Sequence, residues 1–161
     1  MNNGIQNQSK IYVAGHTGLV GSAIVRELNA KGHRNVVYRT HSELDLTDSK
    51  TTTNFFRKEC PEVVILAAAV VGGINVNNVN PVPFIVDNLA IQANVITAAF
   101  ECGVKRLLFL GSSCIYPRDC PQPIKEEYFL SGQLEKTNRS YAIAKIAGVE
   151  KLMSFSRMEL Q

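Results

Sequence analysis

Five residues in the second half of the chain carry side chains that could take part in proton transfer. Ser112, Ser113 and Cys114 supply two hydroxyls and a thiol in three consecutive positions, and Tyr141 precedes Lys145 by four. Residues four apart lie on one face of a helix. Because a nearby ammonium favours an ionised phenol, we expect Lys145 to lower the pKa of Tyr141 from about 10 toward neutrality. The phenol could then act as an acid or a base.

Taken alone, each of these side chains also has an ordinary structural interpretation. Tyr141 could be a half-buried residue of an amphipathic helix, and Cys114 could fill space in a loop. The serines strengthen the chemical interpretation because they follow an apolar run that reads as a strand, and ligands of open α/β proteins collect beyond strand ends. A serine hydroxyl there could bind a carbonyl oxygen while Tyr141 protonates it. A thiol near Lys145 could move a proton at carbon.

The glycines near the start of the chain have the spacing of a dinucleotide-binding turn. Gly15, Gly18 and Gly21 follow the apolar run 11–14 and open a helical pattern. In such a turn the first glycine permits the tight bend, the second lets phosphate oxygens approach the backbone, and the third lets helix and strand pack closely. The helix start offers unpaired N–H groups to a pyrophosphate. The alternative is a tight strand-to-helix turn without a ligand.

The end of the second predicted strand favours NADP over NAD. Sites for NAD usually place a carboxylate there to bind the ribose 2′-hydroxyl, whereas arginine binds the 2′-phosphate of NADP. Here the strand ends at Arg39, and no carboxylate follows until Glu43. Arg39 could alternatively be a solvated surface residue. Asp45 and Leu46 are a plausible edge for the adenine, and the small side chains of 67–69 would give the cofactor a flat wall.

Apolar runs alternate with helical patterns, which predicts an α/β fold with a Rossmann-like, doubly wound parallel sheet. In the helix after the glycines, one apolar stripe is expected to consist of Leu19, Val20, Ala23, Ile24 and Leu28. Asp48 or Ser49 is expected to cap the second helix, and Gly103 to end the third. The predicted strands are 11–14, 35–39, 63–68 and 105–110, and the predicted helices are 19–31, 50–59, 84–101 and 139–157.

The predicted helices 84–101 and 139–157 are apolar almost all round. A helix that covers one sheet face needs only one apolar stripe, so a second covering surface is expected. We therefore expect a homodimer in which these two helices pack against their symmetry mates. No stretch reaches the roughly 20 apolar residues that a bilayer span requires.

Composition predicts a soluble globular protein. The chain has 161 residues, 45% of them hydrophobic and 19% charged, which suits a single domain, expected over 10–161 behind a polar leader at 1–9. A net charge of +3 is too small to indicate a nucleic acid or membrane partner. The leader lacks a secretion signal, so the cytoplasm is the expected location. The four cysteines and three histidines lack metal-ligand spacing, and no metal is expected.

These residues together resemble the extended short-chain dehydrogenase/reductases, and within them the GDP-L-fucose synthases. The resemblance runs from about Lys10 to about Arg157, and its most diagnostic part is the run Gly-Ser-Ser-Cys-Ile-Tyr-Pro at 111–117. It implies an NADP-dependent 3,5-epimerase/4-reductase that acts on GDP-4-keto-6-deoxy-mannose. Ser112, Tyr141 and Lys145 would form the reductase triad, and Cys114 would be the epimerisation base.

The turn and the resemblance together give a set of expected cofactor-binding residues. By resemblance, the loop 72–74 and Asn88 would border the substrate and the nicotinamide. Some relatives carry a basic residue where Thr17 stands, which implies a weaker phosphate grip in this chain. The cofactor-binding residues are expected to be Gly15, His16, Thr17, Gly18, Leu19, Val20, Gly21, Arg39, Asp45, Leu46, Ala67, Ala68, Ala69, Leu110, Gly111, Ser112, Ser113, Tyr141 and Lys145.

Members of that family continue for about as long again. The further part would supply a Pro-Thr-Asn loop, a histidine acid and a small domain for the GDP-sugar, so we expect a Rossmann-like sheet incomplete at its C-terminal side and an exposed fourth strand. Two alternatives remain open. One is another nucleotide-sugar epimerase or dehydratase of the same superfamily, and the other is a non-catalytic NADP-binding remnant.

Overall fold

The computed structural model describes residues 5–159, with side chains to residue 157, and divides the chain into two compact units. The first unit comprises the chain up to Ala69 together with Ala90–Leu110, and the second comprises Val70–Leu89 and the chain from Gly111 onward. The single domain expected from length thus consists of two units, which are described separately. Residues 1–4 of the predicted leader lie outside the described residues, whereas Ile5 packs against the core of the first unit.

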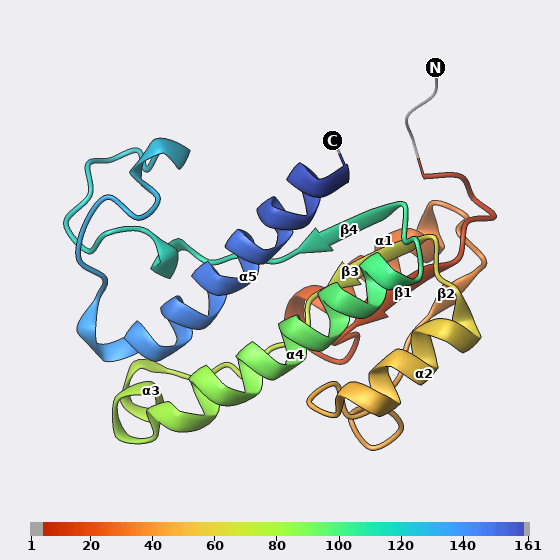
Figure 1. Cartoon of the computed structure of the whole chain (residues 1–161), viewed down its shortest axis with the longest axis horizontal. Coiled ribbons are helices and arrows are strands. Elements are labelled where there is room, and N and C mark those ends of the chain that lie inside the picture. The colour runs from red at the N-terminus through yellow and green to blue at the C-terminus, as the bar shows by residue number, and fades with distance from the viewer. Residues whose placement is uncertain (1–4, 160–161) are drawn as a thin grey trace. The chain divides into compact units, whose positions relative to one another are not determined.

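The first unit contains a parallel four-stranded sheet (Figure 1). Its strands are β1 (Ile11–Ala14), β2 (Val36–Val37), β3 (Val63–Leu66) and β4 (Arg106–Phe109), in the spatial order β2-β1-β3-β4. All pairs are parallel, and Ile11 of β1 stands beside Val36 of β2 and Val63 of β3. The predicted parallel sheet is therefore confirmed.

Helices cover both faces of this sheet, as a doubly wound fold requires. Ile11 and Val13 point to one face, where Ile24 and Leu28 of α1 (Leu19–Ala30) pack against them. On the opposite face, the Tyr12 ring lies 4.6 Å from that of Phe55 and 5.7 Å from that of Phe56, both in α2 (Ser49–Glu59). Since successive residues of a strand point to opposite faces, the two helices lie on opposite sides of β1.

Two details of the first unit differ from the sequence prediction. Leu19 and Val20 were expected in the buried stripe of α1 but are 90% and 48% exposed, because they form the first turn of the helix at the glycine bend rather than facing the sheet. The strands β2, β3 and β4 are shorter than predicted. Of the two expected caps of α2, Asp48 is the one observed, and its carboxylate accepts the Thr51 N–H at 2.8 Å.

The long helix α4 (Pro81–Glu101) begins three residues earlier than predicted, because proline is tolerated in the first turn of a helix. A short helix, α3 (Ile74–Val79), precedes it where the sequence indicated an asparagine-rich loop. By length and composition α4 could cross a membrane, which corrects the expectation that no stretch in the chain could. One such helix is weak evidence, since a core helix passes the same test, and Val95, Ile96 and Ala99 of α4 are buried.

The second unit is built around α5 (Arg139–Glu159), shown in blue in Figure 1. Three short 3-10 helices precede it: η1 (Ser113–Ile115), η2 (Glu126–Tyr128) and η3 (Lys136–Asn138). Helix α5 packs against η1, and α3 packs against η3. These contacts bring the segments around 74–79, 113–115 and 136–145 together within one unit.

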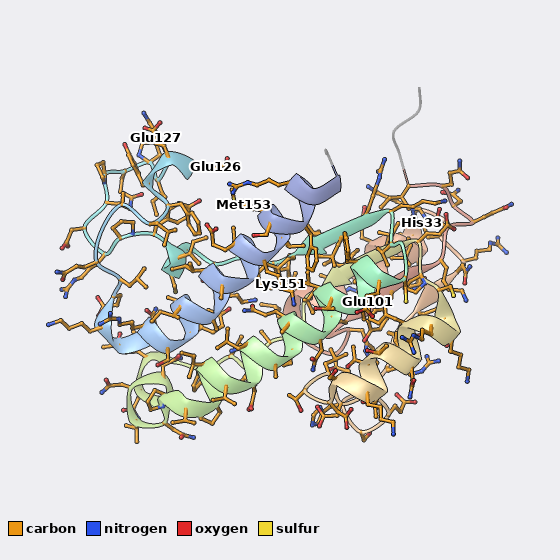
Figure 2. All side chains as sticks on the ribbon, in the orientation of Figure 1. His33, Glu101, Glu126, Glu127, Lys151 and Met153 are labelled. Atoms are coloured by element: carbon orange, nitrogen blue, oxygen red, sulfur yellow. The ribbon has the colours of Figure 1, made fainter. Side chains whose placement is uncertain are left out.

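Each of the two apolar helices leaves some apolar side chains uncovered. Val82, Val86 and Phe100 of α4 are 62%, 54% and 38% exposed. On α5, Ile143 is 37% and Met153 43% exposed. Met153 is labelled on this helix in Figure 2. In the described sheet β4 pairs only with β3, and its Leu108 is 53% exposed, in line with the expected open fourth strand.

Candidate functional site

The glycine turn is shaped by two close backbone contacts. Gly15 has φ +84°, and a Cβ there would lie 2.6 Å from the backbone nitrogen of Ala68. A Cβ on Gly21 would overlap the carbonyl oxygen of Gly15. Around Gly18, by contrast, the nearest atom to a Cβ would be 3.4 Å away. Packing therefore demands glycine at 15 and 21, whereas a Cβ at Gly18 would make only an ordinary van der Waals contact with the Gly15 carbonyl oxygen.

The start of α1 is open for an anion. Gly18 is the N-cap and has no side chain to satisfy the first N–H groups of the helix. Thr17, Gly18 and Leu19 are exposed, so these N–H groups and the positive end of the helix dipole face solvent. This arrangement fits a dinucleotide pyrophosphate, as the glycine spacing predicts.

The end of β2 lies beside the glycine turn within the first unit. The rings of His16 and Tyr38 stack with their centroids 4.4 Å apart. Next to them, the Glu43 carboxylate accepts both the N–H and the hydroxyl of Thr40 at 2.7 Å. These hydrogen bonds, with a smaller contribution from the charges of Arg39 and His16, lower the pKa of Glu43. The end of β2 is thus a place where negative charge is favoured.

Arg39 is already engaged by the protein. Its guanidinium forms a 2.9 Å ion pair with Glu59, donates to the Tyr38 carbonyl at 2.7 Å and lies 5.6 Å from the centre of the Phe55 ring. It is therefore not the solvated surface residue that was the alternative for this position, whereas its contact with a 2′-phosphate stays a prediction. A 2′-phosphate would have to share this guanidinium with Glu59.

Most of the remaining residues predicted to contact the cofactor in the first unit take part in hydrogen bonds within that unit. The Asp45 carboxylate accepts the N–H and the hydroxyl of Thr47 at 2.9 and 2.7 Å, which lowers the pKa of Asp45. Leu46 is buried, and its carbonyl accepts from Asn94 at 2.9 Å. Ala67 donates to the Ala14 carbonyl, and Leu110 donates to that of Leu66. Ala68 and Ala69 are half-buried, and Ala68 lies directly against Gly15.

In the second unit, Cys114 and Tyr141 line one cavity of about 220 Å³, here called the thiol pocket. Sequence analysis predicted that these two side chains share a site, and the structure places them in the same pocket. Both come from elements that pack together, η1 and α5. The pocket is lined by Val71, Gly72, Ile74, Asn77, Cys114, Asn138 and Tyr141.

Lys145 lies next to Tyr141, but the pKa shifts differ from the prediction. The Lys145 Nζ is 5.7 Å from the centre of the Tyr141 ring. Burial raises the pKa of Tyr141, assisted by the negative charge of a Cys114 thiolate. Lys145 is only 3% exposed, and burial lowers its pKa to about 8. The expected lowering of the Tyr141 pKa is therefore wrong, because burial disfavours both charged forms. A protonated phenol is nevertheless the form that a proton donor needs.

The serines and the cysteine are held by the turn of η1. Ser112 is its N-cap, and the Ser112 Oγ accepts the N–H of Cys114 at 3.3 Å. Accepting this bond leaves the Ser112 hydroxyl proton available for donation. Ser113 and Gly111 are exposed. The side-chain amide of Asn138 donates to the Cys114 sulfur at 3.0 Å.

The loop that forms the opposite wall of the pocket is anchored by Asn88. The Asn88 side chain accepts the N–H of Val70 at 2.8 Å and donates to the carbonyls of Val70 and Phe84 at 2.9 and 2.8 Å. A Cβ at Gly72 would lie 2.9 Å from the Phe84 ring, so this glycine allows the loop to pack on α4. Asn88 was expected at the edge of the substrate, and the structure shows it supporting the loop.

Two pocket residues, Asn77 and Asn138, were missed by sequence reasoning. Asn77 is 6% exposed and donates to the carbonyls of Gly72 and Gly73 at 2.9 and 3.2 Å. In both side chains the amide oxygen is buried without a hydrogen-bond partner in the described structure. Asn138 directly precedes the predicted helix 139–157, and its closeness in sequence to Tyr141 was the signal that could have placed it near the pocket. Asn77 gave no such signal because its segment was interpreted as a loop.

Neither a metal cluster nor a disulfide adds to this picture in the part of the chain that the structure describes. No group of three His, Cys, Asp or Glu residues between 5 and 159 could hold a metal ion. All four cysteines are free thiols. The chemically useful groups of the second unit are therefore its hydroxyls, the Cys114 thiol, the Lys145 amine and the amides of the pocket.

Comparison with known proteins shows close relatives. The chain is 58% identical over 147 residues to GDP-L-fucose synthase 1 of Arabidopsis thaliana, covering 91% of this chain and 46% of the relative. It is 49% identical over 151 residues to GDP-L-fucose synthase of Escherichia coli, covering 94% and 47% of the two chains. The chain thus spans about half the length of the curated relatives it matches.

Solved structures agree with these relatives. A GDP-mannoheptose C4 reductase from Campylobacter jejuni with NADP bound superposes with a TM-score of 0.91 and 43% identity, covering 94% of this chain and 48% of that one. A model of the NAD dependent epimerase/dehydratase family matches residues 11–159. This chain therefore belongs to the NAD dependent epimerase/dehydratase family.

Proposed function

We propose that this chain carries the cofactor-binding and acid–base residues of an NADP-dependent epimerase/reductase of the GDP-L-fucose synthase type, acting on GDP-4-keto-6-deoxy-mannose. The observation that carries the proposal is the thiol pocket, in which Cys114 and Tyr141 line one cavity. Reduction of a ketone needs a proton donor such as the Tyr141 phenol. Epimerisation at a carbon atom needs a base that removes its proton, such as the Cys114 thiolate. The curated relatives described above bear the name of this enzyme.

The first unit fits NADP. Bound NADPH would supply the hydride for reduction of the 4-keto group. The open start of α1 at Gly18 would hold the pyrophosphate. Arg39 and the N–H and hydroxyl of Thr40, which already stabilise the Glu43 carboxylate, are suited to the 2′-phosphate. To bind it, Thr40 must exchange the carboxylate for a phosphate, and Arg39 must share its charge with Glu59.

The reduction needs a proton on the carbonyl oxygen while hydride adds to the carbon. In this proposal the Tyr141 O–H gives that proton, and the Ser112 hydroxyl donates a hydrogen bond to the same oxygen. Burial keeps Tyr141 protonated because it raises the pKa of this phenol. Lys145, protonated near neutrality with a pKa of about 8, then stabilises the phenolate left after transfer. The ketone becomes an alcohol.

Epimerisation needs a base beside the ketone. In this proposal the Cys114 thiolate takes the proton from a carbon next to the carbonyl, which forms an S–H bond and leaves an enolate. A general acid returns a proton to the opposite face of that carbon, and the thiol then loses its proton to solvent. Another epimerase or dehydratase of the superfamily that changes only carbon 4 would not need this thiol.

The pocket also offers acceptors for a sugar. The amide oxygens of Asn77 and Asn138 are buried without partners in the described structure, an arrangement that costs about 1–3 kcal/mol for each group. Hydroxyl groups of a bound sugar would donate to these oxygens and remove that penalty. This supports a hydroxyl-rich substrate for the thiol pocket.

The proposal is tested by titrating the chain with NADPH and NADH and then assaying consumption of NADPH with the keto sugar. NADPH should bind at least about tenfold more tightly than NADH, and Arg39→Met should remove most of this preference. Arg34→Met, which changes an exposed arginine, is the matched control. Binding without turnover would indicate a non-catalytic NADP-binding remnant, and equal affinity for the two cofactors would contradict the assignment of NADP.

We further propose a homodimer in the cytoplasm, formed through α4 and α5. The exposed Val86 of α4 and the exposed Ile143 and Met153 of α5, all in the second unit, support this surface. Sedimentation at micromolar concentration should give the mass of two chains, and Val86→Lys should shift it to one. Lys50→Glu, an exposed change on α2, should leave the mass unchanged. A monomeric mass of the unmodified chain would contradict the dimer.

A further inference from the structure

The sulfur of Cys114 has a dedicated hydrogen-bond donor. Asn138 Nδ2 lies 3.0 Å from the sulfur, and both residues line the thiol pocket. Asn138 is the last residue of η3, and α5 begins directly after it. The contact joins residues 24 positions apart, so it depends on the folded arrangement of the second unit rather than on local sequence.

Both partners stand in short helices whose first turn is capped by a side chain. On one side, Cys114 is fixed in η1 because its N–H donates to the Ser112 side chain. On the other side, Glu135 caps η3 by accepting the N–H of Thr137 at 3.3 Å, and the same carboxylate pairs with Arg118 at 3.3 Å. The donor and the sulfur are therefore each part of a separately capped turn, and their hydrogen bond joins the two turns.

The orientation of the Asn138 amide suits a deprotonated sulfur. Its N–H points at the sulfur, and its oxygen is buried without a partner in the described part of the chain. A thiolate accepts hydrogen bonds and donates none, whereas an amide oxygen in this place would face the lone pairs of the sulfur. No partner holds the amide by its oxygen, so the sulfur contact defines the orientation.

We infer that Asn138 is a positioning residue for Cys114: its amide N–H holds the sulfur in the wall of the thiol pocket and is the donor that a thiolate would accept during proton removal. The inference rests on the proposed function, in which Cys114 removes a proton from the substrate. Asn138 does not exchange a proton itself, because an amide does not titrate near neutrality. It acts through the cysteine.

The test measures the alkylation rate of each cysteine in the full chain with iodoacetamide at pH 7.5, resolved by peptide mass spectrometry. Asn138→Asp replaces the donor by a carboxylate, and Asn78→Asp makes the same change at an exposed site on α3 as the matched control. We expect Asn138→Asp to slow alkylation of Cys114 at least about fivefold relative to Cys60, since thiolates react and thiols do not. The control should change the ratio less than about twofold.

Cys60, which is exposed, serves as the internal reference for the reagent, and the half-buried Cys102 reports a general loss of structure because unfolding would expose it. An unchanged or faster Cys114 reaction in Asn138→Asp would overturn the inference, as would an equal slowing of Cys114 and Cys60. If the aspartate variant does not fold, Asn138→Leu removes the donor without adding charge, and the same ratio decides. The assay needs neither cofactor nor substrate. NADPH titration of the same samples therefore tests the proposed function independently.

Discussion

Lys145 makes a prediction about stability that can be worked from its surroundings. The side chain is 3% exposed, and burial lowers its pKa from 10.5 to about 8. The unfolded chain therefore binds a proton that the folded chain releases between these two values. Because stability rises with pH wherever the unfolded state binds more protons, this residue should make the folded state more stable as the pH rises from about 8 toward 10.5.

The size of the effect follows from the difference of about 2.5 between the two pKa values. At about 1.4 kcal/mol for each pKa unit, protonated Lys145 lowers the free energy of unfolding by about 3 kcal/mol below pH 8. Between pH 7 and pH 9.5, about 2 kcal/mol of this penalty should disappear. Lys145→Met keeps most of the side-chain volume and removes the charge, so the variant should lack this pH-dependent gain.

The assay is urea unfolding of the unmodified chain and of Lys145→Met at pH 7, 8 and 9.5. The difference between their free energies of unfolding should change by about 2 kcal/mol in favour of the unmodified chain as the pH rises. The change of this difference with pH is free of every contribution of Lys145 that does not depend on pH. Lys50→Met, at an exposed position, is the control and should give a constant difference. A constant difference for Lys145→Met would refute the argument from burial.

Three further predictions test the fold. Gly21→Ala should lower the free energy of unfolding by at least about 2 kcal/mol, because its methyl group would overlap the Gly15 carbonyl. Gly18→Ala should change the free energy of unfolding by less than about 1 kcal/mol and should weaken only NADPH binding. Urea unfolding and NADPH titration distinguish the two variants. Asp48→Ala should cost about 1 kcal/mol of stability through loss of the α2 cap, and an unchanged urea midpoint would contradict this. Leu108→Lys on the exposed edge strand should reduce aggregation on heating, measured by light scattering, with no loss of stability.

Much of the first unit could be predicted from sequence because its signals are local. The apolar runs and the glycine spacing placed β1, α1 and β3 within a few residues and gave the parallel sheet. The predicted burial of Leu19 was wrong, because the direction of a side chain in the first turn of a helix is not set by the apolar stripe of that helix. Sequence reasoning also failed to predict the ion pair between Glu59 and Arg39, because an ion pair between distant segments produces no pattern in the sequence of either segment.

The candidate site in the second unit was predicted in its residues but not in its electrostatics. The spacing of Tyr141 and Lys145 correctly placed them side by side. It could not indicate how deeply they are buried, and burial reverses the expected pKa shift of Tyr141. Asn138 was missed because an isolated asparagine near a helix start resembles an ordinary capping residue. Only the folded arrangement brings its amide to the sulfur.

The three hydrogen bonds of Asn88 connect α4 to the thiol pocket, although no residue of α4 lines that pocket. Two of them join the helix to Val70 in the loop that follows β3, and the third is donated to the Phe84 carbonyl within the helix. Gly72 of that loop is part of the pocket wall. A small rotation or bend of the helix would thus be passed through one amide to the wall and would change the width of the cavity. Changes on the helix surface would in this way alter the shape of the thiol pocket without any substitution among the residues that line it.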